Sequence, residues 1–333
     1  MFVKCVKDGV LFHVLGKMFH VTIVRADWDM CALQGGDVGE VWLLFGTAEA
    51  GTGQPYPFRV VLKVQKQWER FGDPDSWRRE YDLYVSGFDG VFSPALRWPT
   101  CYHASMRDGE TWLWLAYVEG VSGNGLTADM LEHTAAALGH FQGRLYAQPP
   151  AFLRRVENLN TTAFMENDYR QWHSQTDAYR YIRAEDCAIP LHLRRMLVDL
   201  DRDADRIFAG IRTLPVVLCH KDLWLENIFY VNGDSVLIDW DTAGWGYGGE
   251  DIASLIADDT DPMHLGDYYR RCVPAYYQSF AEWADVSSIE DTYIREMILF
   301  KFGYRLVRRY LLGASDEGRY CQIQALQQIY DMK

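Results

Sequence analysis

The first third of the chain alternates short apolar runs with turn residues. These runs are rich in β-branched and aromatic residues, which favour strands. They predict strands at 21–27, 31–34, 38–48, 58–65, 96–104 and 111–118. One helix is predicted between the fourth and fifth of these strands, with Asp73 as its N-cap and Pro74 at its first position. We therefore expect a β-rich lobe that contains one helix.

Apolar positions take the spacing of amphipathic helices after residue 118. A stretch rich in glycine and asparagine, 119–125, lies where the pattern changes and predicts a hinge. Helices are predicted at 127–146, 163–182, 190–211, 251–257, 264–283, 289–312 and 316–332. The chain is therefore expected to form two domains, residues 1–118 and residues 119–333.

One hairpin interrupts the helical pattern. The dipeptide Asn232-Gly233 lies between apolar runs at 228–231 and 234–238, which is the strongest short-range signal for a hairpin. In a two-residue type I′ turn, Asn227 faces Ile238 across the two strands. The side chains of Asn227 and Asp239 are therefore expected at the same end of the hairpin.

Polar residues around this hairpin have the spacing of a phosphoryl-transfer centre. His220, Asp222 and Asn227 form the pattern H-x-D-x-x-x-x-N, and Asp239 follows the second strand. An asparagine and an aspartate offer the oxygen ligands that Mg²⁺ prefers. Asp222 lies on the preceding loop, where it can accept the proton of a substrate hydroxyl, and His220 is expected to brace that loop. Chance explains a single H-x-D, but the complete set favours phosphoryl transfer.

The β-rich lobe contains candidate phosphate-binding groups. Gly35, Gly36 and Gly39 lie in a turn between two predicted strands, where backbone can close over phosphates. The turn matches neither a Walker A loop nor a dinucleotide fingerprint. Lys63 lies in an apolar strand, and its burial requires a partner, which Glu80 on the predicted helix can supply. Taken alone, Lys63 reads more simply as an outward-facing lysine, but the ordered set favours a nucleotide site.

In this order the residues resemble the aminoglycoside phosphotransferase and choline kinase superfamily, which shares the protein-kinase-like fold. The resemblance extends over residues 35–257 and is strongest at 220–227 and 237–253. It implies an α+β, two-lobed fold. Its N-terminal lobe would be an antiparallel β-sheet with one helix that binds the nucleotide. Its larger C-terminal lobe would be mainly helical and would hold the catalytic and substrate groups.

The resemblance implies a role for each of these residues. Asp222 would be the catalytic base, with His220 beside it, and Asn227 and Asp239 would bind Mg²⁺. Lys63 would contact the ATP phosphates, and Glu80 would orient Lys63. The remaining implied residues are the glycines Gly35, Gly36 and Gly39 at the nucleotide, backbone groups from Ala116 to Val118 at the adenine, and Asp251 as a structural acid that caps the following helix.

The chain departs from the family pattern within the motif. Lys221 stands where antibiotic kinases usually have glycine, and Trp224 is similar to a tryptophan of fructosamine kinases. The run 223–226 also lacks the more usual His-Pro-Gly-like sequence. These departures leave the reacting groups intact, so they bear on the acceptor and not on the reaction.

Aromatic and acidic residues near the motif are candidates for acceptor binding. They are Trp224, Asp241, Trp245, Tyr247, Glu250, Asp258 and Asp259. Aromatic faces attract amines, and carboxylates form charge-assisted hydrogen bonds with amino-sugars. Core packing is the simpler reading for each tryptophan. Most of the excess negative charge falls after residue 118, which favours either a cationic acceptor or simple solubility.

Composition excludes several other classes of protein. A net charge of −13 argues against nucleic acid as a partner. No run of eighteen apolar residues predicts a membrane span, and the N-terminus has no signal-peptide pattern. Seven scattered cysteines without a C-x-x-C pair predict neither a disulfide framework nor a zinc site, so a reducing cytoplasm is expected.

We therefore expect a cytoplasmic phosphotransferase that depends on ATP and Mg²⁺. It would move the γ-phosphate to a hydroxyl of a small, cationic molecule such as an aminoglycoside, an amino-sugar or an amino alcohol. The alternatives are a choline/ethanolamine- or fructosamine-type kinase and a catalytically silent, nucleotide-binding regulatory protein. A protein kinase is disfavoured because no Asp-Phe-Gly and Ala-Pro-Glu pair bounds an activation loop. The sequence does not decide between ATP and GTP, or between a monomer and a homodimer.

Overall fold

The structure, a computed structural model, describes residues 8–33, 39–68, 73–93, 95–289 and 292–332. These residues form two compact units. The first unit is formed within the ranges 1–92, 98–119 and 151–158, and the second within 93–97, 120–150 and 159–333. Each unit has its own strands and helices, which are described separately below.

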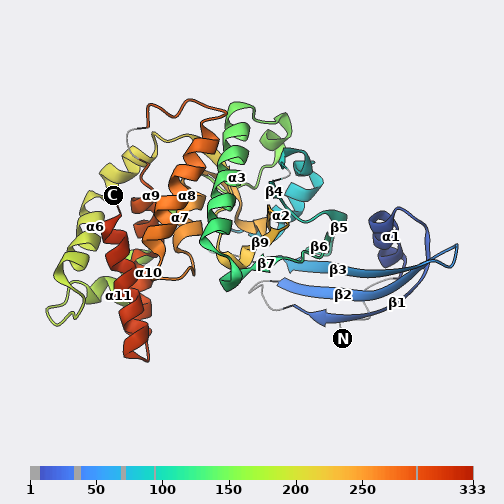
Figure 1. Cartoon of the computed structure of the whole chain (residues 1–333), viewed down its shortest axis with the longest axis horizontal. Helices are drawn as coiled ribbons and strands as arrows, with labels where there is room; N and C mark the ends of the chain where they lie inside the picture. The colour runs from blue at the N-terminus through green and yellow to red at the C-terminus, as the bar shows by residue number, and fades with distance from the viewer. Residues whose placement is uncertain (1–7, 34–38, 69–72, 94, 290–291, 333) are drawn as a thin grey trace. The chain divides into compact units, whose positions relative to one another are not determined.

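A five-stranded antiparallel sheet forms most of the first unit, with the strand order β1-β2-β3-β6-β5 (Figure 1). Its strands are β1 (Ile23–Ala32), β2 (Gly39–Ala50), β3 (Pro55–Lys66), β5 (Cys101–Arg107) and β6 (Glu110–Ala116). Residues 23–32 form the single strand β1, which joins the strands predicted at 21–27 and 31–34. Residue 34 of the second prediction lies outside the described residues. The strand predicted at 96–104 is divided, because Pro99 cannot donate to a sheet ladder. Its first part is β4 (Leu96–Arg97), which belongs to the second unit.

An N-terminal helix, α1 (Asp8–Phe19), covers part of this sheet and contacts β1 and β5 (Figure 1). The sequence pattern predicts no element for these residues. Leu11, Val14 and Leu15 are fully buried and follow the i, i+3, i+4 spacing of one helix face. They pack in one hydrophobic cluster with Leu44 and Leu62 of the sheet.

The helix of the first unit, α2 (Ser76–Val85), begins later than predicted. Asp73 is not its N-cap, because Asp75 occupies that position and makes no side-chain capping bond. Asp73 is buried and pairs with the equally buried Arg79, whose Nη1 donates to the Asp73 Oδ2 over 2.8 Å. The cap prediction was wrong because a buried guanidinium requires a carboxylate more than the helix end does. A short 3₁₀ helix, η2 (Phe88–Val91), follows.

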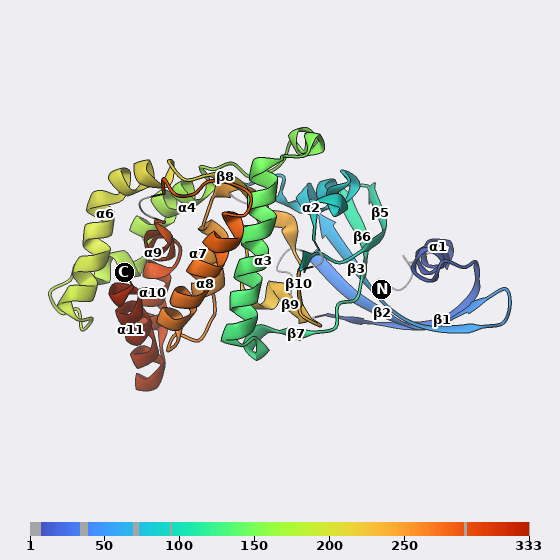
Figure 2. The same cartoon turned by 45° about the horizontal axis from the view of Figure 1, so that its top comes forward.

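Helices dominate the second unit, where α3 and α8 lie side by side (Figure 2). Its helices are α3 (Ala128–Ala147), α4 (Phe164–Trp172), α5 (Asp177–Tyr181), α6 (Leu191–Ile211), α7 (Glu250–Ala257), α8 (Leu265–Phe280), α9 (Ile294–Ile298), α10 (Tyr304–Leu312) and α11 (Asp316–Asp331). The backbones of α3 and α8 approach closely at Gly139, where a Cβ would lie 3.1 Å from the Cα of Tyr276. Among these described helices, none is long and apolar enough to cross a membrane.

Two helices predicted as continuous are interrupted. The segment 163–182 forms α4, a 3₁₀ turn η5 (His173–Gln175) and α5, because Thr176 caps α5 by accepting a hydrogen bond from the backbone N–H of Tyr179. The segment predicted at 289–312 forms α9, a π-helical turn η8 (Leu299–Gly303) and α10. Residues 290 and 291 of that prediction lie outside the described residues.

Short strands in the second unit position the motif. A four-stranded sheet has the order β4-β10-β9-β7 and contains β7 (Val121–Ser122), β9 (Ile228–Val231) and β10 (Asp234–Leu237). A second pair, not predicted from the sequence, consists of β8 (Val216–Cys219) and β11 (Gly244–Tyr247). An antiparallel β-sheet unit and a mainly helical unit thus confirm the predicted α+β class.

Candidate active site

The central loop of the site, here called the motif loop (residues 220–227), connects β8 to β9. It ends in a 3₁₀ turn, η6 (Leu225–Asn227). β8 pairs with β11, so that Cys219, the residue before the loop, lies opposite Gly244. The loop therefore starts and ends on strands of the second unit.

The predicted hairpin is present and has the predicted register. Val231 pairs with Asp234, and the backbone N–H of Ile238 donates to the carbonyl of Asn227 over 3.0 Å. Both turn residues have positive φ angles, 53° for Asn232 and 97° for Gly233, as a type I′ turn requires. The residue that follows Ile238 is Asp239, so the hairpin places Asn227 and Asp239 at one end.

His220 braces the motif loop against this hairpin. Its Nε2–H donates to the carbonyl of Ile238 over 2.8 Å, and its ring lies 4.6 Å from that of the buried Trp240. The imidazole is itself buried. This contact joins the residue two positions before Asp222 to the residue one position before Asp239.

Asn227 contacts Asp222 through its side-chain amide. The Nδ2 group donates to the backbone carbonyl of Asp222 over 2.9 Å and to its carboxylate Oδ2 over 3.3 Å. Because the amide donors point at Asp222, the Oδ1 of Asn227 remains as an acceptor that a cation could use. Asp222 is half-buried, whereas Asn227 is buried.

The donor set fits Mg²⁺. Asp239 has a left-handed backbone with a φ of 63° and precedes a 3₁₀ turn, η7 (Trp240–Thr242). Within the described ranges, no three His, Cys, Asp or Glu side chains gather to hold a metal ion. One amide oxygen and one carboxylate suit Mg²⁺, which keeps water ligands and binds phosphate oxygens besides one or two protein groups.

Asp251 holds the motif loop, although not as the predicted helix cap. The N-cap of α7 is Gly249, and Asp251 lies in the first turn. Its carboxylate instead accepts from the backbone N–H groups of His220 and Lys221, each over 2.8 Å. Burial raises the pKa of Asp251, although these backbone hydrogen bonds lower it in part. The cap prediction was wrong because the orphan N–H groups of the loop compete for the same carboxylate.

Two residues that support Asp251 were not predicted. Gln142 of α3 donates its Nε2 to Asp251 Oδ2 and to the carbonyl of Leu218, both over 3.0 Å. The Tyr276 hydroxyl of α8 in turn donates to Gln142 Oε1 over 2.6 Å. One signal was present in the sequence, because Gln142 interrupts the buried stripe of Leu131, Ala135, Leu138 and Leu145 on its helix.

The first unit contains the predicted lysine pair. Lys63 Nζ of β3 lies 2.6 Å from Glu80 Oε2 of α2, and both side chains are buried. Gly39 begins β2, where a Cβ would lie 2.7 Å from the carbonyl oxygen of Val64. Gly35 and Gly36 of the predicted turn lie outside the described residues.

The predicted adenine-binding segment follows β6. The backbone N–H of Ala116 donates to the carbonyl of Thr100 over 2.8 Å, so this N–H is already used within the unit. Val118 lies two residues beyond the end of β6. An adenine contact from this segment would therefore come from groups other than the N–H of Ala116.

The predicted acceptor residues differ in their surroundings. Partly exposed side chains belong to Trp224, Asp241, Trp245 and Tyr247. Glu250 is only 1% exposed and lies 3.0 Å from Lys221 Nζ. Its burial and this partner make the prediction of Glu250 as an acceptor contact wrong.

Asp258 and Asp259, at the end of α7, each have a basic partner on α10. Asp259 pairs with Arg309, and Asp258 Oδ1 lies 3.9 Å from Arg305 Nη1. Burial raises the pKa of Asp258, Arg305 and Lys301 lower it, and the charges of Asp259 and Asp222 raise it further. Both carboxylates therefore have a cationic partner within the second unit.

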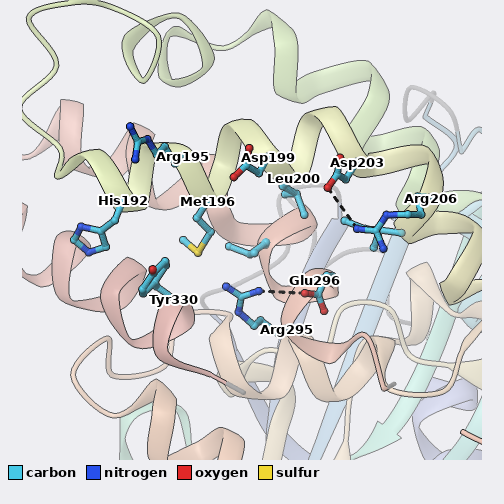
Figure 3. Close-up of a pocket in the computed structure, with 12 residues that line it drawn as sticks. His192, Arg195, Met196, Asp199, Leu200, Asp203, Arg206, Arg295, Glu296 and Tyr330 are labelled. Carbon is cyan, nitrogen blue, oxygen red and sulfur yellow. Dashed lines mark hydrogen bonds and ion pairs between the residues drawn. The ribbon is translucent and has the colours of Figure 1, made fainter. Parts of the chain in front are cut away.

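A cavity of about 430 Å³ lies elsewhere in the second unit, between α6, α9 and α11 (Figure 3). His192, Asp199 and Asp203 of α6 line one side, and Arg295 and Tyr330 line the other. None of the sequence-predicted site residues lines this cavity. It is therefore separate from the motif loop.

Comparisons with known proteins bear on the family and the fold. A family model described as the phosphotransferase enzyme family matches residues 89–283. No match was found among the curated proteins. A choline kinase from Cryptosporidium parvum Iowa II is 11% identical, with a TM-score of 0.56, over 97% of this chain and 95% of that chain.

Two further solved structures are similar. A microcompartment-associated aminopropanol kinase is 15% identical, with a TM-score of 0.53, over 96% of this chain and 95% of that chain. The aminoglycoside phosphotransferase APH(4)-Ia is 14% identical, with a TM-score of 0.49, over 97% and 99%. At these identities, the likeness to the choline and aminopropanol kinases shows the kinase-like fold, as predicted.

Proposed function

This chain belongs to the phosphotransferase enzyme family, and from that premise we propose that it is a small-molecule kinase that depends on ATP and Mg²⁺. It moves the γ-phosphate to a hydroxyl of a small, cationic acceptor. The observation that carries the proposal is the hairpin, which holds Asn227 and Asp239 at one end. The side-chain amide of Asn227 also donates a hydrogen bond to the Asp222 carboxylate.

Each residue of the proposed site then has a task in the reaction. Asp222 orients the attacking hydroxyl and takes its proton as the oxygen bonds to phosphorus. Asn227 Oδ1 and the Asp239 carboxylate hold Mg²⁺, which neutralises phosphate charge when it is bound. Lys63 contacts the phosphates, and Glu80 keeps its ammonium in place. His220 and Asp251 hold the loop backbone so that Asp222 keeps its direction.

Asp258 is the strongest candidate for the acceptor carboxylate. Its side chain is partly exposed, and burial first and the charge of Asp222 last contribute to raising its pKa, whereas Glu250 is buried. A carboxylate at this end of α7 would bind the amine of an amino alcohol or an amino-sugar. Two structures of similar fold are described as a choline kinase and an aminopropanol kinase, so amine-bearing alcohols are the first acceptors to test.

A screen for ADP release tests this function. Wild-type protein is incubated with Mg²⁺, ATP or GTP, and a panel of aminopropanol, choline, ethanolamine, amino-sugars, ketosamines and aminoglycosides. We expect ADP release that depends on both the acceptor and Mg²⁺. Nucleotide binding without transfer to any acceptor would instead support the silent regulatory protein.

The variant Asp239→Ala provides the control for the metal. Removing one of two protein ligands should abolish the Mg²⁺-dependent part of ATP binding, because the remaining amide oxygen binds Mg²⁺ weakly. Calorimetric titration with AMP-PNP, with and without Mg²⁺, measures this difference. Equal stimulation of binding by Mg²⁺ in wild type and variant would contradict the role of Asp239.

A further inference from the structure

Lys221 lies between His220 and Asp222, and the proposed reaction gives it no task. Its side chain is fully buried, and its φ of 67° places a residue with a Cβ in the left-handed region. That conformation is unfavourable for a residue other than glycine. A buried ammonium at a strained position is retained only if its surroundings compensate both costs.

Two adjacent acids of α7 hold Lys221 from both sides. Asp251 Oδ1 accepts from the Lys221 backbone N–H over 2.8 Å. Glu250 Oε1 accepts from the Lys221 Nζ over 3.0 Å. The first turn of one helix therefore binds the backbone and the side chain of the residue immediately before Asp222.

Residues from several segments of the second unit surround the pair of Lys221 and Glu250. Glycine at position 246 is required, because a Cβ there would lie 2.7 Å from Cys219 Sγ and closer still to Glu250 Oε2. The ring of Phe164 lies 5.5 Å from Lys221 Nζ, on a different helix. The pair therefore occupies a site that four separate segments of the second unit enclose.

The Glu250 carboxylate favours the ammonium form of Lys221. Burial lowers the pKa of Lys221, the Glu250 carboxylate raises it, and the net effect is upward. The other titratable groups near the pair are Cys219, His220 and Asp251. Burial raises the pKa of Cys219 well above its ordinary value, so that the thiol stays neutral.

We propose that Lys221 and Glu250 form a buried ion pair that positions Asp222, which makes Lys221 a positioning residue for phosphoryl transfer. This inference rests on the proposed function. The Nζ–Oε1 contact and the Asp251 hydrogen bonds together fix the backbone on the N-terminal side of Asp222. The direction of the Asp222 carboxylate then depends on α7 as well as on Asn227.

The ion pair itself is tested without any enzyme assay. Lys221→Met removes the ammonium and leaves the buried Glu250 without its cation, although the backbone N–H of Tyr247 still donates to Glu250 Oε2 over 3.4 Å. Lys221→Met with Glu250→Gln removes both charges at nearly constant volume. Chemical denaturation of both variants between pH 5 and pH 8 gives the unfolding equilibrium constant. The other titratable groups around the pair are the same in both variants. The difference between their unfolding equilibrium constants therefore reports the ionisation of Glu250 alone.

The sign of the expected difference follows from burial. A lone buried carboxylate has a folded-state pKa above its unfolded value, so rising pH ionises the unfolded state first and favours unfolding. Relative to the double variant, the unfolding constant of Lys221→Met should rise about tenfold per pH unit within this window. Parallel pH dependences in the two variants would overturn the ion pair.

The positioning role is tested by turnover of the double variant. It should fold with near wild-type stability, because neutral isosteres often replace a buried pair at little cost. Its kcat should nevertheless fall about tenfold or more, with the KM for ATP within twofold, because a small misplacement of a catalytic group is costly. A wild-type kcat in the stable double variant would show that the pair supports the fold and does not position Asp222.

If wild type phosphorylates no acceptor, the proposed function fails, while the pH dependence of unfolding still decides whether the ion pair exists.

Discussion

Two residues other than glycine at the proposed reacting groups have a left-handed backbone. One precedes the proposed base, and the other is itself a proposed metal ligand. Lys221 precedes Asp222 with a φ of 67°, and Asp239 itself has a φ of 63°. Such conformations persist where the surroundings impose them, and they gather at functional sites. Here the surroundings are the Asp251 carboxylate at Lys221 and the hairpin end at Asp239. The strain therefore coincides with the residues that the mechanism needs most tightly placed.

Residue-level prediction succeeded where burial could be inferred from a regular element. The pairing of Lys63 with Glu80 was expected because a lysine in an apolar strand needs a carboxylate. The role of Lys221 could not be foreseen, because nothing in a loop sequence reports burial. Glu250 was misassigned for the same reason, since its partner lies 29 residues away in the chain.

Lys63→Met should remove the ammonium that pairs with the buried Glu80 carboxylate in the first unit. Breaking a buried pair from one side typically costs about 3–5 kcal/mol, and denaturation of the variant should show a loss of this size. Lys63→Met with Glu80→Gln should recover most of the stability. Phosphoryl transfer should fall about 100-fold in both variants, because both lack the Lys63 ammonium as a donor to the phosphates. Transfer restored together with stability would contradict the proposed phosphate contact.

Elements with strong local chemistry were the most predictable. The Asn232-Gly233 turn gave the hairpin and its register without any tertiary information. The strands β8 and β11 were missed because each has only four residues and gains its pairing from a partner distant in sequence. The interruptions at 173–175 and 299–303 were missed because the apolar spacing continues across them.

Gly233→Ala tests whether the hairpin turn supports the metal ligands. A Cβ at position 233 meets no atom within 4 Å, so only the φ of 97° opposes the substitution. The free energy of unfolding should fall by about 1–2 kcal/mol, and the Mg²⁺ concentration for half-maximal activity should rise.

Gly53→Ala is the matched control for this substitution. Gly53 also has a positive φ, 81°, and open space around its Cβ position, but it lies in the turn between β2 and β3. It should lower stability by a similar amount and leave the Mg²⁺ dependence unchanged. An equal shift of the Mg²⁺ dependence in both variants would contradict the claim that the hairpin turn supports the metal ligands.

At the scale of the whole molecule, the chain forms two compact units, each with its own core. We propose that residues 1–118 act as the nucleotide-binding lobe and residues 119–333 as the catalytic and substrate lobe. Hydrophobic periodicity predicted the change of architecture between them, because strands and helices differ in period. It could not predict that residues 151–158 join the first unit, since that assignment depends on long-range contacts such as the one from Arg79 Nε to the carbonyl of Asn158, over 2.6 Å.

One cysteine in each unit reports on that unit separately, the partly buried Cys101 and the buried Cys272. Burial raises the pKa of Cys101, in the first unit, to about 12, and that of Cys272, in the second, also to about 12. At pH 8 only about one such thiol in ten thousand is ionised, so both should resist a thiol reagent that modifies the exposed Cys31.

Increasing denaturant should expose Cys101 and Cys272 at different midpoints if the two units unfold independently. Mass spectrometry of the labelled peptides identifies which cysteine has reacted at each concentration. A single shared midpoint for both cysteines would show instead that the chain unfolds as one cooperative body.

The central claim is that Asp222 takes the proton of an acceptor hydroxyl while the γ-phosphate is transferred. Phosphorus NMR of ATP, Mg²⁺ and an acceptor identified in the ADP-release screen measures this most directly. Wild type should produce a phosphomonoester resonance as the γ-phosphate signal of ATP declines. Asp222→Asn should bind the nucleotide normally and form the product at least about 100-fold more slowly. Phosphomonoester formation at the wild-type rate by Asp222→Asn would contradict the account.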